Sequence, residues 1–417
     1  MDEFGAELAS WIDQRGIGVR ELARRSGYSY GFISQLRSGT RLPSPQTAQD
    51  LDDALNAGGS LTEAAAAAVH VPRAPVGADG DLGLIELARR AQASDIGAGT
   101  VELLATATDR MCRDYPVVEP RLLSDQAGTH LRYVTGLLGK RVTLAEHREL
   151  LVIAGWLAAL LACTLYDVGD PSAAETARRM TRQFGEHAGH GELVAWSFEI
   201  AAWYALVEGR FPQVVKLCEG GLVHAGVSNA AVQLTLQASR AYARMADNRA
   251  TQTLAAGNAI LGQLPVPEHP EHHFVFDRDK YEFYVATIYT WLGTDDRAAE
   301  ENAREVVARC LGPGGAVRWP TRLSTTLVNL GQIAGRRGDL DEAVGLGTSA
   351  LQCGRRSAEL LPRAAELEQR LAARYGGEPL VNDYGEALRE EIRALPAGAA
   401  VRLDEAVGRR LAGRELT

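Results

Sequence analysis

Apolar residues recur along most of the chain at the 3.6-residue spacing of α-helices. From about residue 82 to residue 375 nearly every segment has this period, and no stretch alternates convincingly between apolar and polar residues as a half-buried strand does. Residues 4–57 contain four or five shorter helical patterns, separated by Gly and Ser. The pattern therefore predicts an all-α fold class.

A unit made of an apolar helix, a turn and a second helix recurs within the long segment. The turns lie roughly 40 residues apart, at Gly169, Gly209, Asp247, Gly293 and Gly338. Four glycines are followed five positions later by a small residue that lets two helices approach closely: Ala174, Val214, Ala298 and Ala343. One copy, "GDLDEA", resembles the turn of a tetratricopeptide repeat. The recurrence predicts a tetratricopeptide-like α-helical repeat array with a concave binding face, and the alternative is a helical bundle with coincidental turns.

Two short segments divide the chain. The run "SLTEAAAAAVH" has a helical pattern and a capping box from Ser60 to Glu63. The stretch at 71–81 is rich in Pro and Gly and has the composition of a linker. We therefore predict a helix-turn-helix domain at residues 1–58, a helical connector and linker at 59–81, the repeat domain at 82–380 and C-terminal capping helices at 381–417.

The segment from Leu150 to Tyr166 contains no charged residue. It falls just short of the ~20 residues that a membrane-spanning helix needs, and its flanks "EHRE" and "DVGD" show no basic bias. The acidic N-terminal residues lack the apolar run of a signal peptide. We expect a buried helix, no membrane association and a cytoplasmic location.

The composition limits which partners the chain can bind. Its net charge of -9 does not favour a polyanion over the whole surface, so contact with nucleic acid requires a local basic patch. The five cysteines stand singly, without a C-x-x-C pair, which predicts reduced, buried thiols and neither a disulfide framework nor a zinc site. We predict no cofactor.

The stretch "VRELARRSGYSYGFISQL", residues 19–36, has the spacing of a helix-turn-helix. Gly27 permits the left-handed backbone that ends the first helix, and Ser29 is a favourable N-cap for the second. The residues Phe32, Ile33 and Leu36 form the apolar face of that second helix. The opposite side then presents four residues where a recognition helix meets base edges in the major groove: Tyr30, Gly31, Ser34 and Gln35.

Arginines surround these outward positions. We predict that five of them neutralise phosphates of double-stranded DNA: Arg20, Arg24, Arg25, Arg37 and Arg41. A Gln side chain can form two hydrogen bonds to adenine, and Ser can bond several bases. Residues 1–57 nevertheless carry more acids than bases, which predicts modest DNA binding by a monomer and a reliance on a homodimer.

Residues 4–57 resemble the lambda-repressor-like helix-turn-helix domains of the xenobiotic-response-element (XRE) family. The resemblance rests on "ELARRSG", "SYGFISQLRSGTR" and "LPSPQTAQDLDDAL". It implies base contacts from the four outward residues and a phosphate contact from Arg41. The family commonly has a carboxylate where Arg37 stands and a polar residue where Val19 stands, so this chain departs from it at both positions.

A domain of this kind followed by a degenerate tetratricopeptide array resembles regulators common in actinobacteria and the peptide-sensing regulators of other Gram-positive bacteria. That resemblance implies that the helical array forms a homodimer. It also implies that the array binds a small-molecule or peptide effector.

Residues 267–293, "PEHPEHHFVFDRDKYEFYVATIYTWLG", form the densest stretch of aromatic residues and histidines. The stretch has neither an H-x-x-x-H pair nor a cysteine partner, so we predict no metal site. Two interpretations stay open: its aromatic residues fill a core, or they face a ligand. The ligand-binding candidates on the second interpretation are His272, His273, Asp277, Tyr281, Tyr284 and Trp291.

No catalytic signature accompanies these features. The sequence has no G-x-S-x-G turn, no dinucleotide-binding fingerprint and no H-E-x-x-H pair, and "GPGGAVRWP" lacks the Lys-Ser/Thr of a phosphate loop. We therefore predict a non-enzymatic, sequence-specific transcriptional regulator, without catalytic residues, that binds a DNA operator. The alternative is a non-enzymatic adaptor that binds partner proteins through its repeats.

Overall fold

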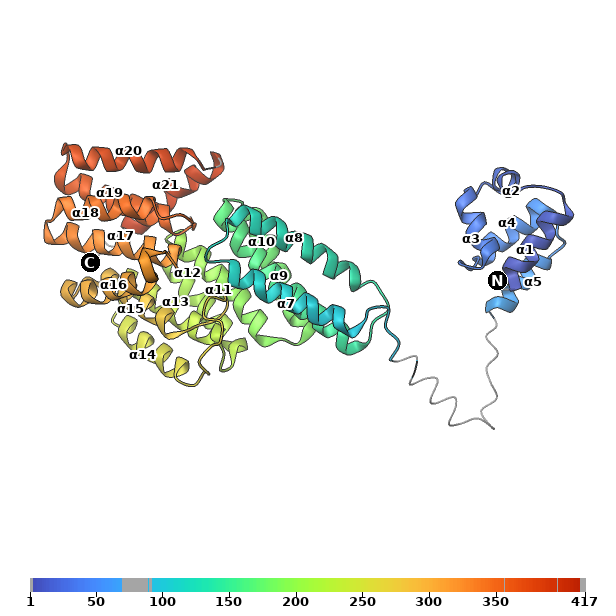
Figure 1. Ribbon diagram of the computed structural model, residues 1–417, viewed down its shortest axis with the longest axis horizontal. Coiled ribbons are helices and arrows are strands. Elements are labelled where there is room, and N and C mark those ends of the chain that lie inside the picture. Colours follow the sequence, from blue (N-terminus) through green and yellow to red (C-terminus); the bar gives the residue numbers. More distant parts are fainter. Residues whose placement is uncertain (1–2, 70–88, 90–91, 356, 396, 413–417) are drawn as a thin grey trace. The chain divides into compact units, whose positions relative to one another are not determined.

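The computed structural model describes residues 3–69, 89, 92–355, 357–395 and 397–412. The chain forms two units, Met1–Arg90 and Ala91–Thr417. The described residues fold into α-helices and one short 3₁₀ helix at Pro313–Gly315, without a strand (Figure 1). The prediction of an all-α fold is confirmed. The linker predicted at 71–81 lies outside the described residues.

The first unit is built from short helices around one apolar core. Its described helices are α1 (Glu3–Gln14), α2 (Val19–Ser26), α3 (Tyr30–Ser38), α4 (Pro45–Leu55) and α5 (Ser60–Val69). Phe4, Leu22, Leu36 and Leu51 are fully buried where these helices meet. Each helix therefore contributes one apolar side to a shared interior.

The helix α5 belongs to the core of the first unit, although the sequence pattern placed residues 59–69 in a connector. It packs against α1 and α4 and buries Leu61 completely. The predicted capping box between Ser60 and Glu63 does not form, because Ser60 is already the first helical residue and its hydroxyl has no partner. The Asp52 carboxylate caps this helix instead and accepts the backbone N–H of Leu61 at 2.8 Å.

The second unit is a series of helices that pack in sequence order. They are α7 (Ala98–Asp114), α8 (Pro120–Leu137), α9 (Leu144–Val168), α10 (Pro171–Ala188), α11 (Gly191–Val207), α12 (Phe211–Ala225), α13 (Asn229–Arg244), α14 (Arg249–Leu261), α15 (Arg278–Leu292), α16 (Asp296–Cys310), α17 (Pro320–Arg337), α18 (Leu340–Leu351), α19 (Leu360–Tyr375), α20 (Pro379–Arg393) and α21 (Ala397–Ala412). From α9 to α18, successive pairs form antiparallel hairpins that stack on one another (Figure 1). This region has a helical repeat-like architecture, and α20 and α21 follow it where capping helices were predicted.

Each predicted turn lies between the two helices of a hairpin. Four turn glycines have φ between 66° and 99°, the left-handed region that favours glycine: Gly169, Gly209, Gly293 and Gly338. In the remaining hairpin Ala246 takes this conformation, with φ of 53°, immediately before Asp247. The glycine spacing in the sequence therefore marks where the chain reverses.

The small residue expected after each turn glycine is fully buried in three hairpins, at Ala174, Val214 and Ala343. In the hairpin of α15 and α16, Ala298 is half-buried and Ala299 is buried in its place. The reason is a longer turn, since α16 begins three residues after its glycine whereas the second helices of the other three begin two residues after theirs.

The uncharged segment of the sequence forms most of α9. Among the described residues, α9 is the one helix that is long and apolar enough to cross a membrane by length and composition. In this fold it packs against α7, α8, α10 and α11, and Leu150, Leu157 and Leu160 are fully buried. A helix covered on several sides by protein needs apolar residues around most of its circumference, which accounts for the composition.

The cysteines are unbonded and mostly buried. Cys112, Cys163, Cys218 and Cys310 are buried, and Cys353 is half-buried. Burial raises the pKa of the Cys310 thiol to about 12, so this thiol stays protonated at neutral pH. Within the part of the chain that the structure describes, no three His, Cys, Asp or Glu side chains are grouped to hold a metal ion.

A buried ionic network ties the C-terminal helices to the middle of the second unit. Four arginines surround the indole of Trp291, with their guanidinium groups 4.5 to 5.8 Å from its centroid. At most 1% of each residue's surface is exposed. We call these residues the arginine cluster: Arg240, Arg244, Arg363 and Arg410. Glu359 accepts hydrogen bonds from Arg240 and Arg363, and Glu366 accepts them from Arg244 at 2.7 Å and Arg410 at 3.3 Å. Because the arginines lie on α13, α19 and α21, the network fixes the C-terminal helices to the repeat helices.

Candidate functional site

The helices α2 and α3 are joined by a tight turn. Gly27 ends α2 with φ of 74°, and the Ser29 hydroxyl caps α3 by accepting the backbone N–H of Phe32 at 3.3 Å. Ile33 and Leu36 are fully buried beneath α3. The turn, the cap and two of the three residues of the buried face are those that the sequence pattern predicts for a helix-turn-helix.

Phe32 differs from the predicted buried face because it is only half-buried. Its ring stacks on that of Tyr28, with centroids 5.1 Å apart, and the guanidinium of Arg41 lies 4.6 Å from its centroid. A cation held over an aromatic ring is restrained without losing its charge. Phe32 therefore lies at the edge of the apolar face and positions Arg41 beside α3.

The predicted base-contacting residues lie on the accessible side of α3. Tyr30 is 54% exposed, Gly31 and Gln35 are also exposed, and Ser34 is half-buried. The Gln35 side-chain amide has no hydrogen-bond partner among the described residues. A Cβ atom built on Gly31 would meet no atom within 4 Å. This side of α3 is thus open to another molecule.

The five predicted phosphate-contacting arginines are all exposed, but their charges are not equally available. Arg24 and Arg25 donate to Glu21 at 2.6 and 2.9 Å. The hydrogen bond from Arg24 is the largest cause that lowers the pKa of Glu21 to about 2, so this group of charges persists at neutral pH. The other three form no ion pair with the described residues: Arg20, Arg37 and Arg41.

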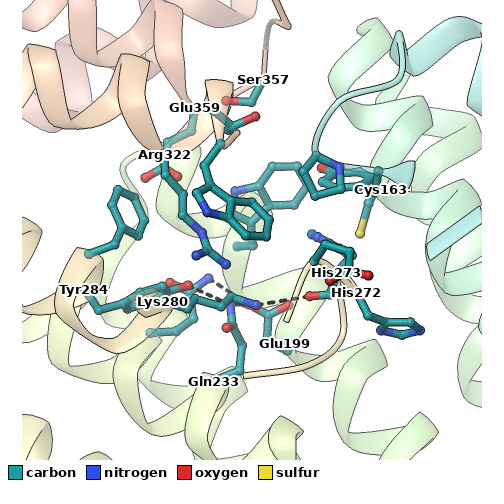
Figure 2. A pocket seen from close by; sticks show the side chains of 18 of the residues that line it. Cys163, Glu199, Gln233, His272, His273, Lys280, Tyr284, Arg322, Ser357 and Glu359 are labelled. Atoms are coloured by element: carbon teal, nitrogen blue, oxygen red, sulfur yellow. Dashed lines mark hydrogen bonds between the residues drawn. The ribbon is translucent and has the colours of Figure 1, made fainter. Parts of the chain in front are cut away.

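A cavity of about 140 Å³ lies in the second unit, on the side formed by the first helices of the hairpins (Figure 2). The helices α9, α11, α13, α15 and α17 each contribute side chains to its lining. Six aromatic residues form much of the wall: Tyr115, Trp196, Trp203, Phe283, Tyr284 and Trp319. A cavity of about 150 Å³ accommodates benzene, so this space has the size of a single ring.

The structure divides the six ligand-binding candidates into two groups. Three line the cavity: His272, His273 and Tyr284. The other three do not: Asp277, Tyr281 and Trp291. Asp277 caps α15 by accepting the backbone N–H of Lys280 at 2.9 Å, Tyr281 is buried with Arg278 over its ring, and Trp291 lies inside the arginine cluster.

The two histidines of the lining are uncharged at neutral pH. Burial lowers the pKa of His272 to about 4 and holds that of His273 well below its ordinary value. The ring of His273 also lies 3.8 Å from the ring of Tyr115. Both histidines therefore present polar but uncharged imidazole rings to the cavity.

A hydrogen-bonded group of polar residues forms one side of the cavity. Glu199 accepts from the amides of Gln233 at 2.8 Å and Gln237 at 2.9 Å, and Gln233 also donates to the Tyr284 hydroxyl at 2.7 Å. Burial raises the pKa of Glu199, while these amide donors act in the opposite direction. Beside them, the Lys280 ammonium donates to two backbone carbonyls at 3.1 and 3.2 Å.

Sequence reasoning missed the charged residues of this lining. Glu199, Lys280 and Arg322 lie on α11, α15 and α17, and no local motif links them. One signal was available, because the chain has only three lysines. Lys280 is the one lysine within the aromatic stretch, where it follows the cap of α15. The other two, Lys140 and Lys216, lie outside this stretch and are exposed.

A family model described as a helix-turn-helix domain matches residues 3–65. The match spans α1 to α4 and the first part of α5, so the N-terminal helix-turn-helix domain is confirmed, and it includes the helix that the sequence pattern left outside. A comparison with curated proteins found no match. The domain indicates, in general terms, a DNA-binding regulator.

Proposed function

We propose that the chain is a cytoplasmic, sequence-specific transcriptional regulator of the XRE type, without enzymatic activity. Its second unit would act as a tetratricopeptide-like array that forms a dimer and binds an effector. The observation that best supports this proposal is the outward side of α3. There, exposed polar residues lie above a buried apolar face, beside three arginines that have no ion pair among the described residues.

This arrangement suits both parts of DNA recognition. A recognition helix presents its N-terminal residues to base edges in the major groove, and Gln35 can form two hydrogen bonds to adenine. Arginines at its margin attract phosphates regardless of sequence. A mobility-shift titration with fragments selected from the source genome tests the proposal, since binding should weaken steeply as salt is raised. An adaptor without DNA affinity would shift no fragment at any salt concentration.

Replacing Gln35 by alanine should lower the affinity for a selected operator by roughly 1 to 3 kcal/mol and relax base preference at one position per half-site. The amide is exposed and has no partner among the described residues, so the fold should not change. Titrations of the operator and of versions altered at that position provide the measurement. Gln14→Ala, at an exposed position of α1, is the matched control. Unchanged operator affinity in Gln35→Ala would mean that the recognition face is wrongly assigned.

Arg41→Ala provides a contrast to that variant. Its guanidinium lies over Phe32 and should contact phosphate, so specific and random DNA should lose affinity by the same factor. The slope of log affinity against log salt should also fall by about 1. A loss confined to the operator would contradict a phosphate contact.

The second unit should hold two copies of the chain together. One domain with few cations binds a site weakly, whereas paired domains can read half-sites about 34 Å apart or a multiple of that distance. The helices α7 and α8 support this idea, because Leu103, Leu122 and Tyr133 are 72%, 53% and 55% exposed. We expect light scattering at micromolar concentration to give the mass of a dimer. A monomer mass, both with and without DNA, would contradict it.

The cavity of the second unit is the proposed effector site. It combines aromatic walls with a few polar groups, as small-molecule sites usually do. Its size favours a small molecule over a peptide. An effector that couples to the DNA-binding unit by about 1 to 3 kcal/mol would change operator occupancy several-fold.

A further inference from the structure

Some buried polar atoms of the residues that line the cavity have no hydrogen-bond partner among the described residues. In the part of the chain that the structure describes, three buried donors of the lining have no hydrogen-bond partner: Trp196 Nε1, Arg240 Nε and Arg322 Nη1. One buried acceptor, Gln233 Oε1, and the hydroxyl of Ser357 are also without a partner. Nearly all buried polar groups in proteins are hydrogen-bonded. Unpaired donors thus outnumber unpaired acceptors among the side chains that surround the cavity.

Each carboxylate of the lining has partners at one of its two oxygens. Glu359 accepts from two arginines of the cluster, and Glu199 accepts from two glutamine amides. Glu271 lies 3.1 Å from the ring nitrogen of His269. A cationic ligand would therefore meet carboxylates that already accept hydrogen bonds from arginine, amide or imidazole groups.

The cations of the lining are less well neutralised. Among the described residues, Lys280 has no carboxylate oxygen within 4 Å, and Arg322 lies 3.8 Å from Asp277, beyond hydrogen-bonding distance. Figure 2 shows the Arg322 guanidinium extending into the cavity toward the side that carries Lys280 and Glu199. Burial lowers the pKa of Lys280 to about 8, which leaves it mainly protonated at pH 7. Among the described residues, the two side chains thus offer charged donors with no carboxylate within hydrogen-bonding distance.

The remaining walls set the size and shape of the ligand. The guanidinium of Arg322 lies 4.4 Å from the centroid of Trp319, which restrains it at the edge of the cavity. Rings of Trp196, Trp203 and Phe283 offer flat apolar surfaces nearby. Aromatic faces and a volume of about 140 Å³ suit one planar ring.

We propose that this cavity binds a small aromatic carboxylate, with its anionic group on Arg322 and Lys280 and its ring between the aromatic walls. A planar guanidinium can hold a carboxylate through two parallel hydrogen bonds, and the ammonium adds a third charged donor. The proposal rests on the proposed function, for which it names the chemical class of the effector.

Titration calorimetry on the unmodified full-length chain tests the ligand class without relying on any variant. The probes are benzoate, its neutral analogue benzamide, and acetate, which has the charge without the ring. Benzoate should bind at least about tenfold more tightly than either comparison molecule, because hydrogen bonds to charged groups and ring burial both contribute. Benzamide that binds as tightly as benzoate, or benzoate that does not bind, would overturn the proposal.

Variants then locate the site. Arg322→Met and Lys280→Met should each weaken benzoate binding about tenfold or more, because each removes a charged donor while keeping most of the apolar stem. Arg297→Met changes an arginine whose side chain is 90% exposed on α16 and should leave the affinity unchanged. Circular dichroism confirms that each variant is folded. Benzoate affinity that is unchanged in both folded pocket variants would place the ligand elsewhere and overturn the proposal.

Operator titrations in the presence of benzoate separate this inference from the proposed function. Benzoate that binds in the cavity but leaves operator affinity unchanged would support the site and contradict its effector role. Operator affinity that responds to a cell extract, while benzoate neither binds nor competes, would overturn the ligand class and leave the proposed regulator intact.

Discussion

Replacing Glu366 by alanine is expected to destabilise the second unit by about 3 to 5 kcal/mol. Its side chain is fully buried and accepts hydrogen bonds from Arg244, Arg410 and Arg370. Removal of this carboxylate leaves the charges of three arginines without their shared partner, two of them fully buried. A buried charge that loses its partner costs far more than an exposed ion pair contributes.

Urea unfolding followed by circular dichroism measures this loss. Glu386→Ala, at an exposed position of α20, is the matched control and should change stability by no more than about 0.5 kcal/mol. A destabilisation below about 1 kcal/mol in Glu366→Ala would show that the arginines find other partners or solvent.

The same network should make the second unit sensitive to acid. Although burial opposes ionisation of Glu359, the charges of Arg240 and Arg363 lower its pKa from 4.5 to about 2, and arginines lower that of Glu366 as well. A carboxyl whose pKa is lower in the folded state stabilises the fold above its unfolded pKa and loses this contribution as pH falls through the folded one. Stability should therefore decrease between about pH 4.5 and pH 2, and less steeply in Glu366→Gln.

Leu36→Ala should abolish operator binding by unfolding the first unit. Leu36 is fully buried in the small core under α3, and such a truncation costs roughly 2 to 5 kcal/mol. A core of this size rarely supplies more than about 3 to 5 kcal/mol in total. Hydrogen exchange on the full chain should show loss of protection across α1 to α5 and unchanged protection in the second unit.

The matched control for that loss is Leu42→Ala, because Leu42 is 57% exposed. Its hydrogen exchange should remain that of the unmodified chain. Protection of α1 to α5 retained in Leu36→Ala would show that the first unit is stabilised by more than its own core.

Local signals in the sequence were sufficient for the local parts of the fold. Gly27 and Ser29 mark the turn of the helix-turn-helix, and Gly169 and Gly338 mark hairpin turns, because backbone conformation at these positions depends on the residue itself. The prediction of the α5 cap was wrong because the residue that caps this helix is not a local one. The backbone N–H of Leu61 donates to the carboxylate of Asp52 instead. Asp52 lies eight residues before the helix and comes close to it only through packing.

The cavity could be predicted only in part. The aromatic stretch drew attention to His272, His273 and Tyr284, which do line it, but Glu199 and Arg322 come from helices more than a hundred residues apart in sequence. No spacing rule connects residues that only the stacking of hairpins brings together. Trp291 was a candidate because of its neighbours in sequence, yet four arginines from other helices enclose it.

The open space around Gly31 bears on how such a protein changes its target. A Cβ built at that position would meet no atom of another element within 4 Å, and the side chain of Gln35 forms no hydrogen bond with the described residues. Alanine at a helical glycine even favours the helix by up to about 1 kcal/mol. Folding therefore places little constraint on the two positions. If they read bases as proposed, gene duplicates could diverge in target site while retaining the same second unit. On the proposed function, a library randomised at 31 and 35 should yield proteins with new target sites and an unchanged core.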